Sequence, residues 1–243
     1  MSVVLETMGL KKSFGGVQVI DDLSVTLNEG EALGIVGPNG SGKTTTLNVL
    51  SGLYKATAGR VLLDGTDVTD MPPHQRAAAG LGRTFQNIRL FRTMTALENV
   101  VIGAERPGNR LVGQGEEALK DRAMSALSFV GLGARANELV SSFSYGHQRL
   151  IEIARALAAN PTLLLLDEPA AGLNSTEKLE LHELLKRIAA QGLTILIIDH
   201  DMTLVSEAAQ HITVLNFGRR IADGESMAVL RHPDVVSAYL GSD

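Results

Sequence analysis

The sequence predicts an α/β protein with a mostly parallel central sheet, an antiparallel β subdomain near the N-terminus and an inserted helical subdomain. Two almost wholly apolar runs, Thr162–Leu166 and Leu193–Ile198, are typical of strands buried on both faces of a parallel sheet. Helical spacing follows each run, over Glu177–Ala190 and over Met202–Ala209. Strands that alternate with helices imply a parallel α/β core.

The N-terminal part of the chain predicts a small antiparallel sheet followed by a strand, a loop and a helix. Val3–Leu10 and Ile20–Leu27 have the apolar spacing of short strands, and Phe14-Gly15-Gly16 supplies a turn between them. Ala32–Val36 is an apolar strand that enters a glycine-rich loop. Thr44–Leu53 carries leucines at helical spacing.

Turn signals place the remaining elements of the core. Arg60–Leu63 is a predicted strand followed by an Asp-Gly turn, and Pro72-Pro73 opens a short helix toward Ala79. Near the C-terminus we expect strand pairs around Phe217-Gly218 and Asp223-Gly224, and a terminal helix over Pro233–Leu240.

The middle of the chain is predicted to be helical. Thr95–Ile102 and Glu116–Val130 are the main helices, separated by the glycine- and proline-containing stretch Gly103–Gly115, and a further helix covers Tyr145–Ala159. We therefore expect one domain over residues 1–243. Its core comprises residues 1–86 and 147–243, and its helical subdomain comprises residues 87–146.

Composition limits the classes of function. The 243 residues are 44% hydrophobic and 20% charged, which is ordinary for a folded chain, and the absence of cysteine excludes disulfides and thiolate metal sites. The longest apolar runs fall well below the roughly 20 residues needed to cross a bilayer. The first residues lack the pattern of a signal peptide, so we expect the chain in the cytoplasm. A net charge of −5 without a basic block argues against nucleic-acid binding.

The strongest motif is a phosphate-binding loop after the strand Ala32–Val36. Its sequence, GPNGSGKT, matches the pattern G-x-x-x-x-G-K-[ST], in which glycines let backbone N–H groups converge on phosphate oxygens. We expect Lys43 to reach the β- and γ-phosphates and the hydroxyl of Thr44 to bind Mg²⁺. A plain glycine-rich turn is the alternative. The predicted ATP contacts are Gly37, Pro38, Asn39, Gly40, Ser41, Gly42, Lys43, Thr44 and Thr45.

Two carboxylates follow the predicted strand that ends at Leu166. The carboxyl ends of strands are where ligands bind in open α/β sheets. Asp167 suits the Mg²⁺ shell, directly or through water, and Glu168 suits the activation of a water that attacks the γ-phosphate. The alternative is a pair of solvated helix-capping carboxylates.

Further residues narrow the family. The segment FSYGHQ, residues 143–148, lies shortly before Asp167 and resembles the L-S-G-G-Q-Q signature of ATP-binding cassette proteins. Gln86 resembles the Q-loop glutamine, His200 the switch histidine and Phe14 the adenine-stacking aromatic of that family. The resemblance spans the whole chain and implies a P-loop NTPase fold with a RecA-like core.

The resemblance also implies a head-to-tail dimer, in which ATP lies between the phosphate loop of one subunit and the signature segment of the other. The residues expected to contact the partner's ATP are Ser144, Tyr145, Gly146 and His147. A hydroxyl, backbone N–H groups and a helix N-terminus there suit a phosphate. The alternative for Ser144 is a plain helix N-cap. Homodimer and heterodimer remain open.

Three residues have roles that the resemblance implies. Gln86 ligates Mg²⁺ or water, with a solvated glutamine as the alternative. His200 donates to the γ-phosphate and holds Glu168 and the water in line. Phe14 stacks on adenine beside Val19, with a core phenylalanine as the competing interpretation.

Within the family, the stretches RTFQNIRLF (83–91), DEPAAGLN (167–174) and PDVVSAYLG (233–241) look like branched-chain amino acid importers. Amides, urea or other amino acids remain possible substrates. Two positions depart from the family pattern, because His147 replaces a glutamine and Asn174 replaces an aspartate. Both put the hydrolysis rate and the dimer contacts in doubt, but we expect an active ATPase.

The resulting prediction is a subunit that hydrolyses ATP on the cytoplasmic face of the plasma membrane. It partners a second ATP-binding subunit, integral permease subunits and, indirectly, a solute-binding protein. Leu90, Phe91 and Met94 are candidates for the permease contact, or they pack inside the helical subdomain. The alternative function is a soluble cassette ATPase that acts on nucleic acid or ribosomes. A small-molecule kinase would leave the signature segment unexplained.

Overall fold

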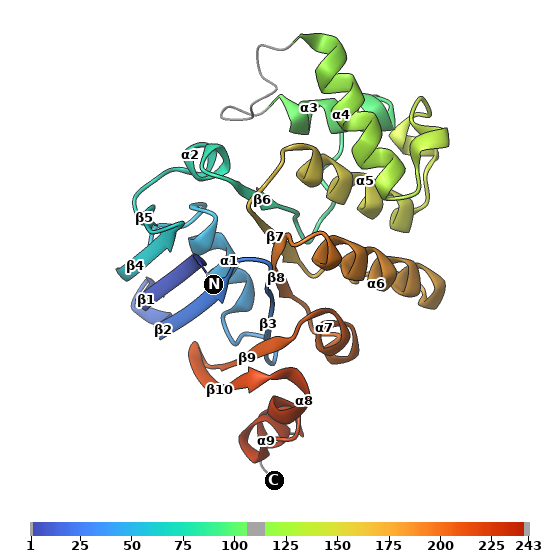
Figure 1. Ribbon diagram of the computed structural model, residues 1–243. Coiled ribbons are helices and arrows are strands. Elements are labelled where there is room, and N and C mark those ends of the chain that lie inside the picture. Colours follow the sequence, from blue (N-terminus) through green and yellow to red (C-terminus); the bar gives the residue numbers. More distant parts are fainter. Residues whose placement is uncertain (1, 106–114, 241–243) are drawn as a thin grey trace.

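The computed structural model describes residues 2–105 and 115–240, and within them the strands form two sheets (Figure 1). The larger sheet has the order β10-β9-β3-β8-β7-β6, and the smaller has the order β2-β1-β4-β5. All neighbours in the larger sheet are parallel except β9 and β10, and all neighbours in the smaller sheet are antiparallel. The predicted fold class is confirmed.

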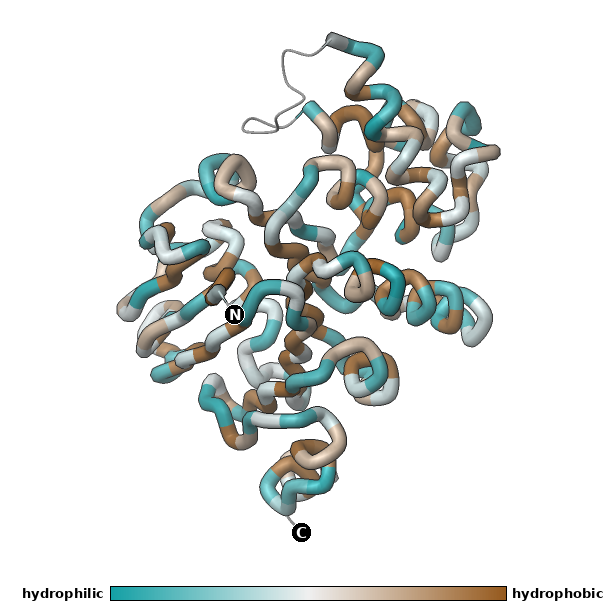
Figure 2. The backbone as a smooth tube through the Cα atoms, viewed as in Figure 1, coloured by the Kyte–Doolittle hydropathy of each residue, from teal (hydrophilic) through white to brown (hydrophobic). Residues whose placement is uncertain are grey.

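Apolar residues on alternate sides of the parallel strands build two cores. In β7 (Leu163–Asp167), Leu163 and Leu165 join the core under the antiparallel sheet, while Leu164 and Leu166 join the core under the helices. The same alternation continues in β8 (Thr194–Ile198) and β3 (Ala32–Val36). Figure 2 shows the resulting hydrophobic centre of the molecule. Burial on both faces explains why these strands are apolar except at Asp167 and Thr194, which lie at strand ends.

The smaller sheet follows the predicted hairpin. β1 (Val3–Phe14) and β2 (Val17–Asn28) pair through the turn Gly15-Gly16, where both glycines have positive φ. The other strands are β4 (Ala58–Leu63) and β5 (Thr66–Asp67). α1 (Lys43–Leu50) contributes its leucines to the core beneath this sheet.

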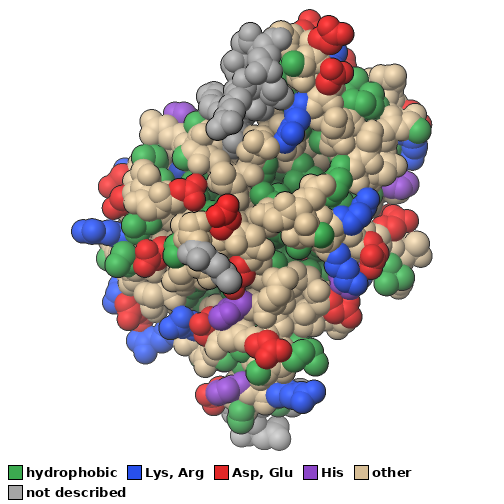
Figure 3. Space-filling view, in the orientation of Figure 1, with side chains coloured by type: hydrophobic (Ala, Val, Ile, Leu, Met, Phe, Trp, Pro, Cys, Tyr) green, Lys and Arg blue, Asp and Glu red, His purple; other side chains and the backbone are tan. Residues whose placement is uncertain are grey.

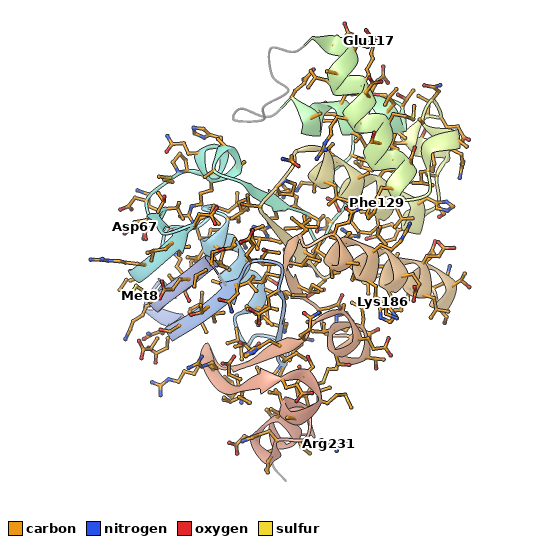
Figure 4. The ribbon with its side chains drawn as sticks, in the orientation of Figure 1. Met8, Asp67, Glu117, Phe129, Lys186 and Arg231 are labelled. Carbon is orange, nitrogen blue, oxygen red and sulfur yellow. The ribbon has the colours of Figure 1, made fainter. Side chains whose placement is uncertain are left out.

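A helical group projects from one side of the core (Figure 1). It comprises α3 (Ala96–Ala104), α4 (Glu116–Phe129) and α5 (Tyr145–Ala158), with 3₁₀ turns at Gly133–Arg135 and Val140–Ser142. The labelled Phe129 ends α4 next to α6, where the Arg187 guanidinium lies 5.3 Å from its ring centroid (Figure 4). α5 packs against α3 and α4, and the predicted division at residues 146 and 147 falls within its first turn.

The remaining elements complete the core. They are α2 (Pro73–Ala78), β6 (Leu81–Arg83), α6 (Ser175–Ala190), α7 (Met202–Ala208), β9 (His211–Asn216), β10 (Arg219–Glu225), α8 (Ser226–Val229) and α9 (Pro233–Leu240). Within the described ranges, no helix is long and apolar enough to cross a bilayer.

Four local expectations were wrong. α1 ends at Leu50, so Leu53 lies beyond the helix and is exposed. Gly103 lies inside α3, where its missing side chain lets the helix approach the Arg155 carbonyl of α5, and residues 106–114 of the predicted linker lie outside the described residues. Asp223 and Gly224 belong to β10 rather than to a turn. The short strand β6 was not predicted at all.

Candidate functional site

The phosphate loop joins β3 to α1 and is held by backbone contacts on both sides. A Cβ on Gly37 would stand 2.2 Å from the Leu215 carbonyl oxygen, and one on Gly42 would stand 2.7 Å from the Val19 carbonyl oxygen. Only glycine fits these approaches, and Gly42 also has a φ of 102°. Of the remaining loop residues, Ser41 is buried, Asn39 and Gly40 are exposed, and Pro38, Thr44 and Thr45 are half-buried.

Lys43 is anchored inside this loop. Its buried ammonium donates to the carbonyl oxygens of Gly37 at 2.6 Å and Pro38 at 2.9 Å. Burial lowers the pKa of Lys43, and the carboxylates of Glu168 and Asp199 oppose that effect. The loop is therefore folded around a cation, as the binding of phosphate requires.

The carboxylate of Asp167 has two oxygens in different surroundings. Oδ2 accepts a hydrogen bond from the Arg83 guanidinium at 2.9 Å. Oδ1 is buried and has no hydrogen-bond partner among the described residues, and the same holds for Oγ of Ser41 in the phosphate loop. Burial raises the pKa of Asp167, while the neighbouring Arg83 counteracts the rise.

These oxygens fit a hard divalent cation. Mg²⁺ is held by one or two carboxylates together with substrate phosphates rather than by a cage made of protein alone. The described part of the chain holds no cluster of three or more His, Cys, Asp or Glu that could bind a metal. The free oxygen of Asp167 and the hydroxyl of Thr44 suit that mode of binding.

Gln86, Glu168 and His200 meet at the carboxyl ends of three neighbouring parallel strands. They follow β6, β7 and β8, and adjacent parallel strands bring their carboxyl ends to one edge of the sheet. The Gln86 amide donates to Oε2 of Glu168 at 2.9 Å, and Nδ1 of His200 lies 3.9 Å from the same oxygen. The group can orient one water molecule.

The backbone at Glu168 is unusual. Its φ of 44° is in the left-handed region, which is costly for a residue with a side chain and is often kept at functional sites. The Glu168 N–H donates to the Ile198 carbonyl oxygen at 2.7 Å, which holds the turn against β8. The Glu168 side chain is largely buried, whereas the His200 side chain is 60% exposed.

The signature segment begins α5, and the donors of Ser144, Gly146 and His147 are already occupied within the subunit. Ser144 is the N-cap of α5, as the alternative interpretation allowed, and its hydroxyl accepts from the His147 N–H. The same hydroxyl donates to Oε1 of Glu177 at 3.2 Å, and the Gly146 N–H donates to that oxygen at 3.2 Å. A carboxylate from α6 therefore lies where a phosphate of the partner's ATP was predicted.

The side chains beside this helix start pack against neighbouring loops. Tyr145 lies so close to Gly172 that a Cβ on this glycine would stand 3.1 Å from the tyrosine ring. The ring of His147, the residue that departs from the family pattern, stands edge-on to Phe143 with the ring centroids 6.2 Å apart. Asn174, the other departure, caps α6 by accepting from the Glu177 N–H.

Phe14 is available for stacking. Its side chain is 41% exposed, so the alternative of a core phenylalanine is wrong. The ring stands edge-on to Tyr54 at 5.3 Å between centroids, and the Lys12 ammonium lies 4.5 Å from its centroid. Val19, the predicted apolar neighbour, is half-buried and lies close to Gly42 of the phosphate loop.

A buried ion pair links the signature helix to the segment around Gln86. Arg149 and Glu152 of α5 are joined at 2.6 Å, with both side chains almost completely buried. The Arg149 guanidinium also donates to the carbonyl oxygens of Phe85 at 2.6 Å and Gln86 at 2.7 Å. Burial raises the pKa of Glu152, and Arg149 opposes the rise. The backbone at Gln86 is thus tied to α5.

The predicted permease-contact residues are in unequal environments. Phe91 is 52% exposed, whereas Leu90 packs against the helical core and Met94 is half-buried. Of these three side chains, that of Phe91 is exposed enough to contact a partner. Leu90 packs inside the subunit, as the alternative interpretation expected.

Together these features define a class of protein. A buried lysine in a glycine-rich strand–loop–helix and a carboxylate pair at the end of a parallel strand are the site of a P-loop nucleotide-binding protein. The family model described as ABC transporter matches residues 20–171. The chain belongs to the ABC transporter family and is an ATP-binding, ATP-hydrolysing subunit that drives transport.

Known relatives extend over the whole chain. The high-affinity branched-chain amino acid transport ATP-binding protein BraF of Pseudomonas aeruginosa is 39% identical over 98% of both chains. The solved ADP conformation of MJ1267, an ATP-binding cassette of an ABC transporter, matches with a TM-score of 0.90 and 34% identity over 100% of both chains. The dimeric post-hydrolysis structure of the cassette MJ0796 bound to ADP and Pi matches with a TM-score of 0.81 and 28% identity over 91% and 98% of the two chains.

The residues that support this site are not marked by any motif that assigns them a role. Arg83 was noticed only within a family-like stretch, and its contact with Asp167 spans 84 positions. Asn174 and Glu177 form a capping box that is visible as N-x-x-E, yet that pattern shows only the helix start. The additional contacts of Glu177 with Ser144 and Gly146 required the fold.

Proposed function

We propose that this chain powers an importer for branched-chain amino acids. The support is its likeness to BraF, a branched-chain amino acid transport ATP-binding protein, at 39% identity over 98% of both chains. Nothing in the comparisons favours the alternative of a soluble ATPase on nucleic acid or ribosomes. On the face seen in Figure 3, lysine and arginine side chains are interspersed with acidic ones and do not form one basic patch.

The observation that carries the proposed chemistry is the convergence of Gln86, Glu168 and His200. ATP binds with its phosphates around Lys43 and with its adenine against Phe14 and Val19. Glu168 accepts the proton of the attacking water, while the Gln86 amide and the His200 imidazole hold that water in line. Thr44, Gln86 and Asp167 would hold Mg²⁺, which would supply positive charge to neutralise the phosphates.

The site is completed by another subunit. Ser144, Tyr145, Gly146 and His147 of one subunit face the ATP of the other, which the dimeric state of the related cassette MJ0796 supports. The Glu177 carboxylate must then leave the N-terminus of α5 so that the γ-phosphate takes its hydrogen bonds. ATP binding closes this dimer and hydrolysis reopens it.

The motion passes to the membrane through the helical subdomain of residues 87–146. We place the chain on the cytoplasmic face of the membrane, in contact with integral permease subunits and, through them, with a solute-binding protein. The buried pair Arg149 and Glu152 supports this coupling, because it fixes the backbone at Gln86 to the signature helix. Phe91 is the exposed apolar candidate for the permease contact.

Uptake measurements test the substrate. Cells of the source organism that lack this gene should lose high-affinity uptake of radiolabelled leucine, isoleucine and valine, and the wild-type gene should restore it. A gene for Glu168→Gln should not restore it. Unchanged uptake of these three amino acids, with loss of uptake of an amide or of urea, would show that the substrate assignment is wrong.

A further inference from the structure

Arg83 lies at the end of β6 and connects the end of β7 to the C-terminal end of α1. Its guanidinium donates to Oδ2 of Asp167 at 2.9 Å and to Oδ1 of Asn48 at 2.8 Å, and it also contacts the Ser51 hydroxyl. The Arg83 and Asp167 side chains are only 7% and 3% exposed. A planar guanidinium has five donors in a fixed fork, so one residue can hold several acceptors in a set geometry.

The contact with Arg83 places the two carboxylate oxygens of Asp167 in different roles. Oδ2 is taken by Arg83, whereas the buried Oδ1 has no partner among the residues that the structure describes. A carboxylate without such a contact could rotate and exchange its two oxygens. The guanidinium therefore fixes which oxygen of Asp167 remains available to a cation.

The contacts with α1 tie that oxygen to the phosphate loop. Asn48 and Ser51 lie toward the C-terminal end of the helix whose first turn carries Lys43 and Thr44. The same end of α1 is held by the buried guanidinium of Arg76, which donates to the carbonyl oxygens of Val49 and Leu50 at 2.7 Å. A helix fixed at its end cannot slide relative to β7, so the separation of Thr44 and Asp167 is set.

We propose that Arg83 is a positioning residue for Mg²⁺: it holds Asp167 with Oδ1 directed to the cation and locks that oxygen in place relative to Thr44. This inference rests on the Mg²⁺ site of the proposed function. Arg83 touches neither ATP nor the cation. Residues that orient metal ligands in this way change metal affinity by about 10- to 100-fold when they are replaced.

Binding measurements separate this role from a general structural one. We would measure the affinity of the purified chain for ATP in EDTA, and then the affinity of the ATP complex for Mn²⁺ by the loss of the free Mn²⁺ resonance. Arg83→Met should leave the first unchanged and weaken the second about 10- to 100-fold. Arg83→Lys, which keeps the charge but not the fork, should fall between wild type and Arg83→Met.

Arg89→Met is the matched control. The guanidinium groups of Arg83 and Arg89 lie 4.9 Å and 4.3 Å from the centroid of the same Phe85 ring, but Arg89 is exposed, and Asp167 takes its hydrogen bond from Arg83. Replacing Arg89 should change neither affinity. Melting temperatures check folding, because removing one partner of a buried ion pair is destabilising, and Arg83→Lys decides the question if Arg83→Met does not fold.

Asp167→Asn separates the role of Arg83 from the Mg²⁺ site itself. In the Asp167→Asn background, Arg83→Met should weaken Mn²⁺ binding no further. Both changes act on the same cation ligand, Oδ1 of Asp167, the first by removing its charge and the second by releasing its orientation. If Asp167→Asn weakens Mn²⁺ binding and Arg83→Met does not, the role of Arg83 is wrong and the Mg²⁺ site stands. If neither variant changes it, the Mg²⁺ site at Asp167 is itself wrong. If Arg83→Met weakened ATP binding in EDTA and Mn²⁺ binding by the same factor, the role of Arg83 would be structural only.

Discussion

The phosphate loop and the N-terminus of α5 are both proposed sites for ATP phosphates, but the subunit leaves them in opposite states. The loop is already folded around Lys43, and buried oxygens of Ser41 and Asp167 have no partner among the described residues. At α5, the donors of Ser144 and Gly146 are taken by Glu177. One half of the site is prepared for a nucleotide, whereas the other must exchange an internal carboxylate for a phosphate.

From this difference we infer that one half of the site binds ATP and the other responds to the partner's γ-phosphate. The prepared half can bind ATP within a single subunit, because its contacts need no rearrangement of another element. The occupied half contributes only when the gain from a partner's phosphate exceeds the loss of the Glu177 contacts. Dimer closure is then sensitive to the presence of the γ-phosphate.

The largest effect is expected at Glu168, in the prepared half. Glu168→Gln should reduce steady-state hydrolysis about 10²- to 10⁴-fold, because the amide cannot accept the proton of the attacking water. ATP binding should remain, since the substitution preserves the shape of the side chain and leaves the hydrogen bonds of Lys43 to Gly37 and Pro38 in place. Phosphate release and equilibrium binding measure the two effects. Hydrolysis near the wild-type rate would mean that another group is the base.

A smaller effect, on affinity alone, is expected at Phe14. Stacking of a base on an aromatic ring contributes about 1 to 3 kcal/mol, so Phe14→Ala should weaken ATP binding by the single subunit by roughly 5- to 150-fold. Phe14→Tyr should bind like wild type, and Phe14→Leu should resemble the alanine variant because it keeps apolar volume without a ring. Equal affinity in all three variants would place the adenine elsewhere.

The smallest effect is expected at Glu177, in the occupied half. A charge-assisted hydrogen bond exceeds a neutral one by about 1 kcal/mol, so Glu177→Gln should lower the ATP concentration for half-maximal dimerisation about fivefold. Light scattering in a Glu168→Gln background, where ATP is not consumed, measures this shift. Glutamine also serves at the third position of a capping box, so α6 should be unaffected.

The control for Glu177 is Glu98→Gln. Glu98 holds the same position in the capping box of α3, with Thr95 as its N-cap, and is exposed. It should leave dimerisation unchanged. A Glu177 variant that dimerises less readily than wild type would show that the carboxylate supports closure rather than competing with it.

Local sequence signals predicted most of the fold. The bounds of the strand Ala32–Val36 were predicted correctly because a short apolar run directly before a glycine-rich loop marks both ends of the strand. The bounds of α9 were predicted from Pro233, which begins the helix. β6 was missed because Leu81–Arg83 is too short to show a period and forms a strand only through its pairing with β7.

The candidate site was predictable where a motif is contiguous and not where the fold assembles it. GPNGSGKT and the Asp167-Glu168 pair carry their chemistry in sequence, so Lys43 and both carboxylates could be named. Arg83 contacts Asp167, which is 84 positions away in the sequence, and Glu177 contacts Ser144, which is more than 30 positions away. No local sequence pattern predicts either contact. The roles of the site residues remain predictions until they are measured.

Completion of each site by another subunit can be tested by crosslinking, because the chain has no cysteine of its own. Two single-cysteine chains, Asn39→Cys in the exposed part of the phosphate loop and Tyr145→Cys in the signature segment, are mixed in a Glu168→Gln background and treated with a short bis-maleimide. A crosslink can then form only between chains. We expect a crosslinked heterodimer with Mg²⁺ and ATP, and little with ADP or without nucleotide. Saturating ATP binding without that crosslink, or equal crosslinking in all three conditions, would show that ATP does not bring the phosphate loop of one subunit to the signature segment of another.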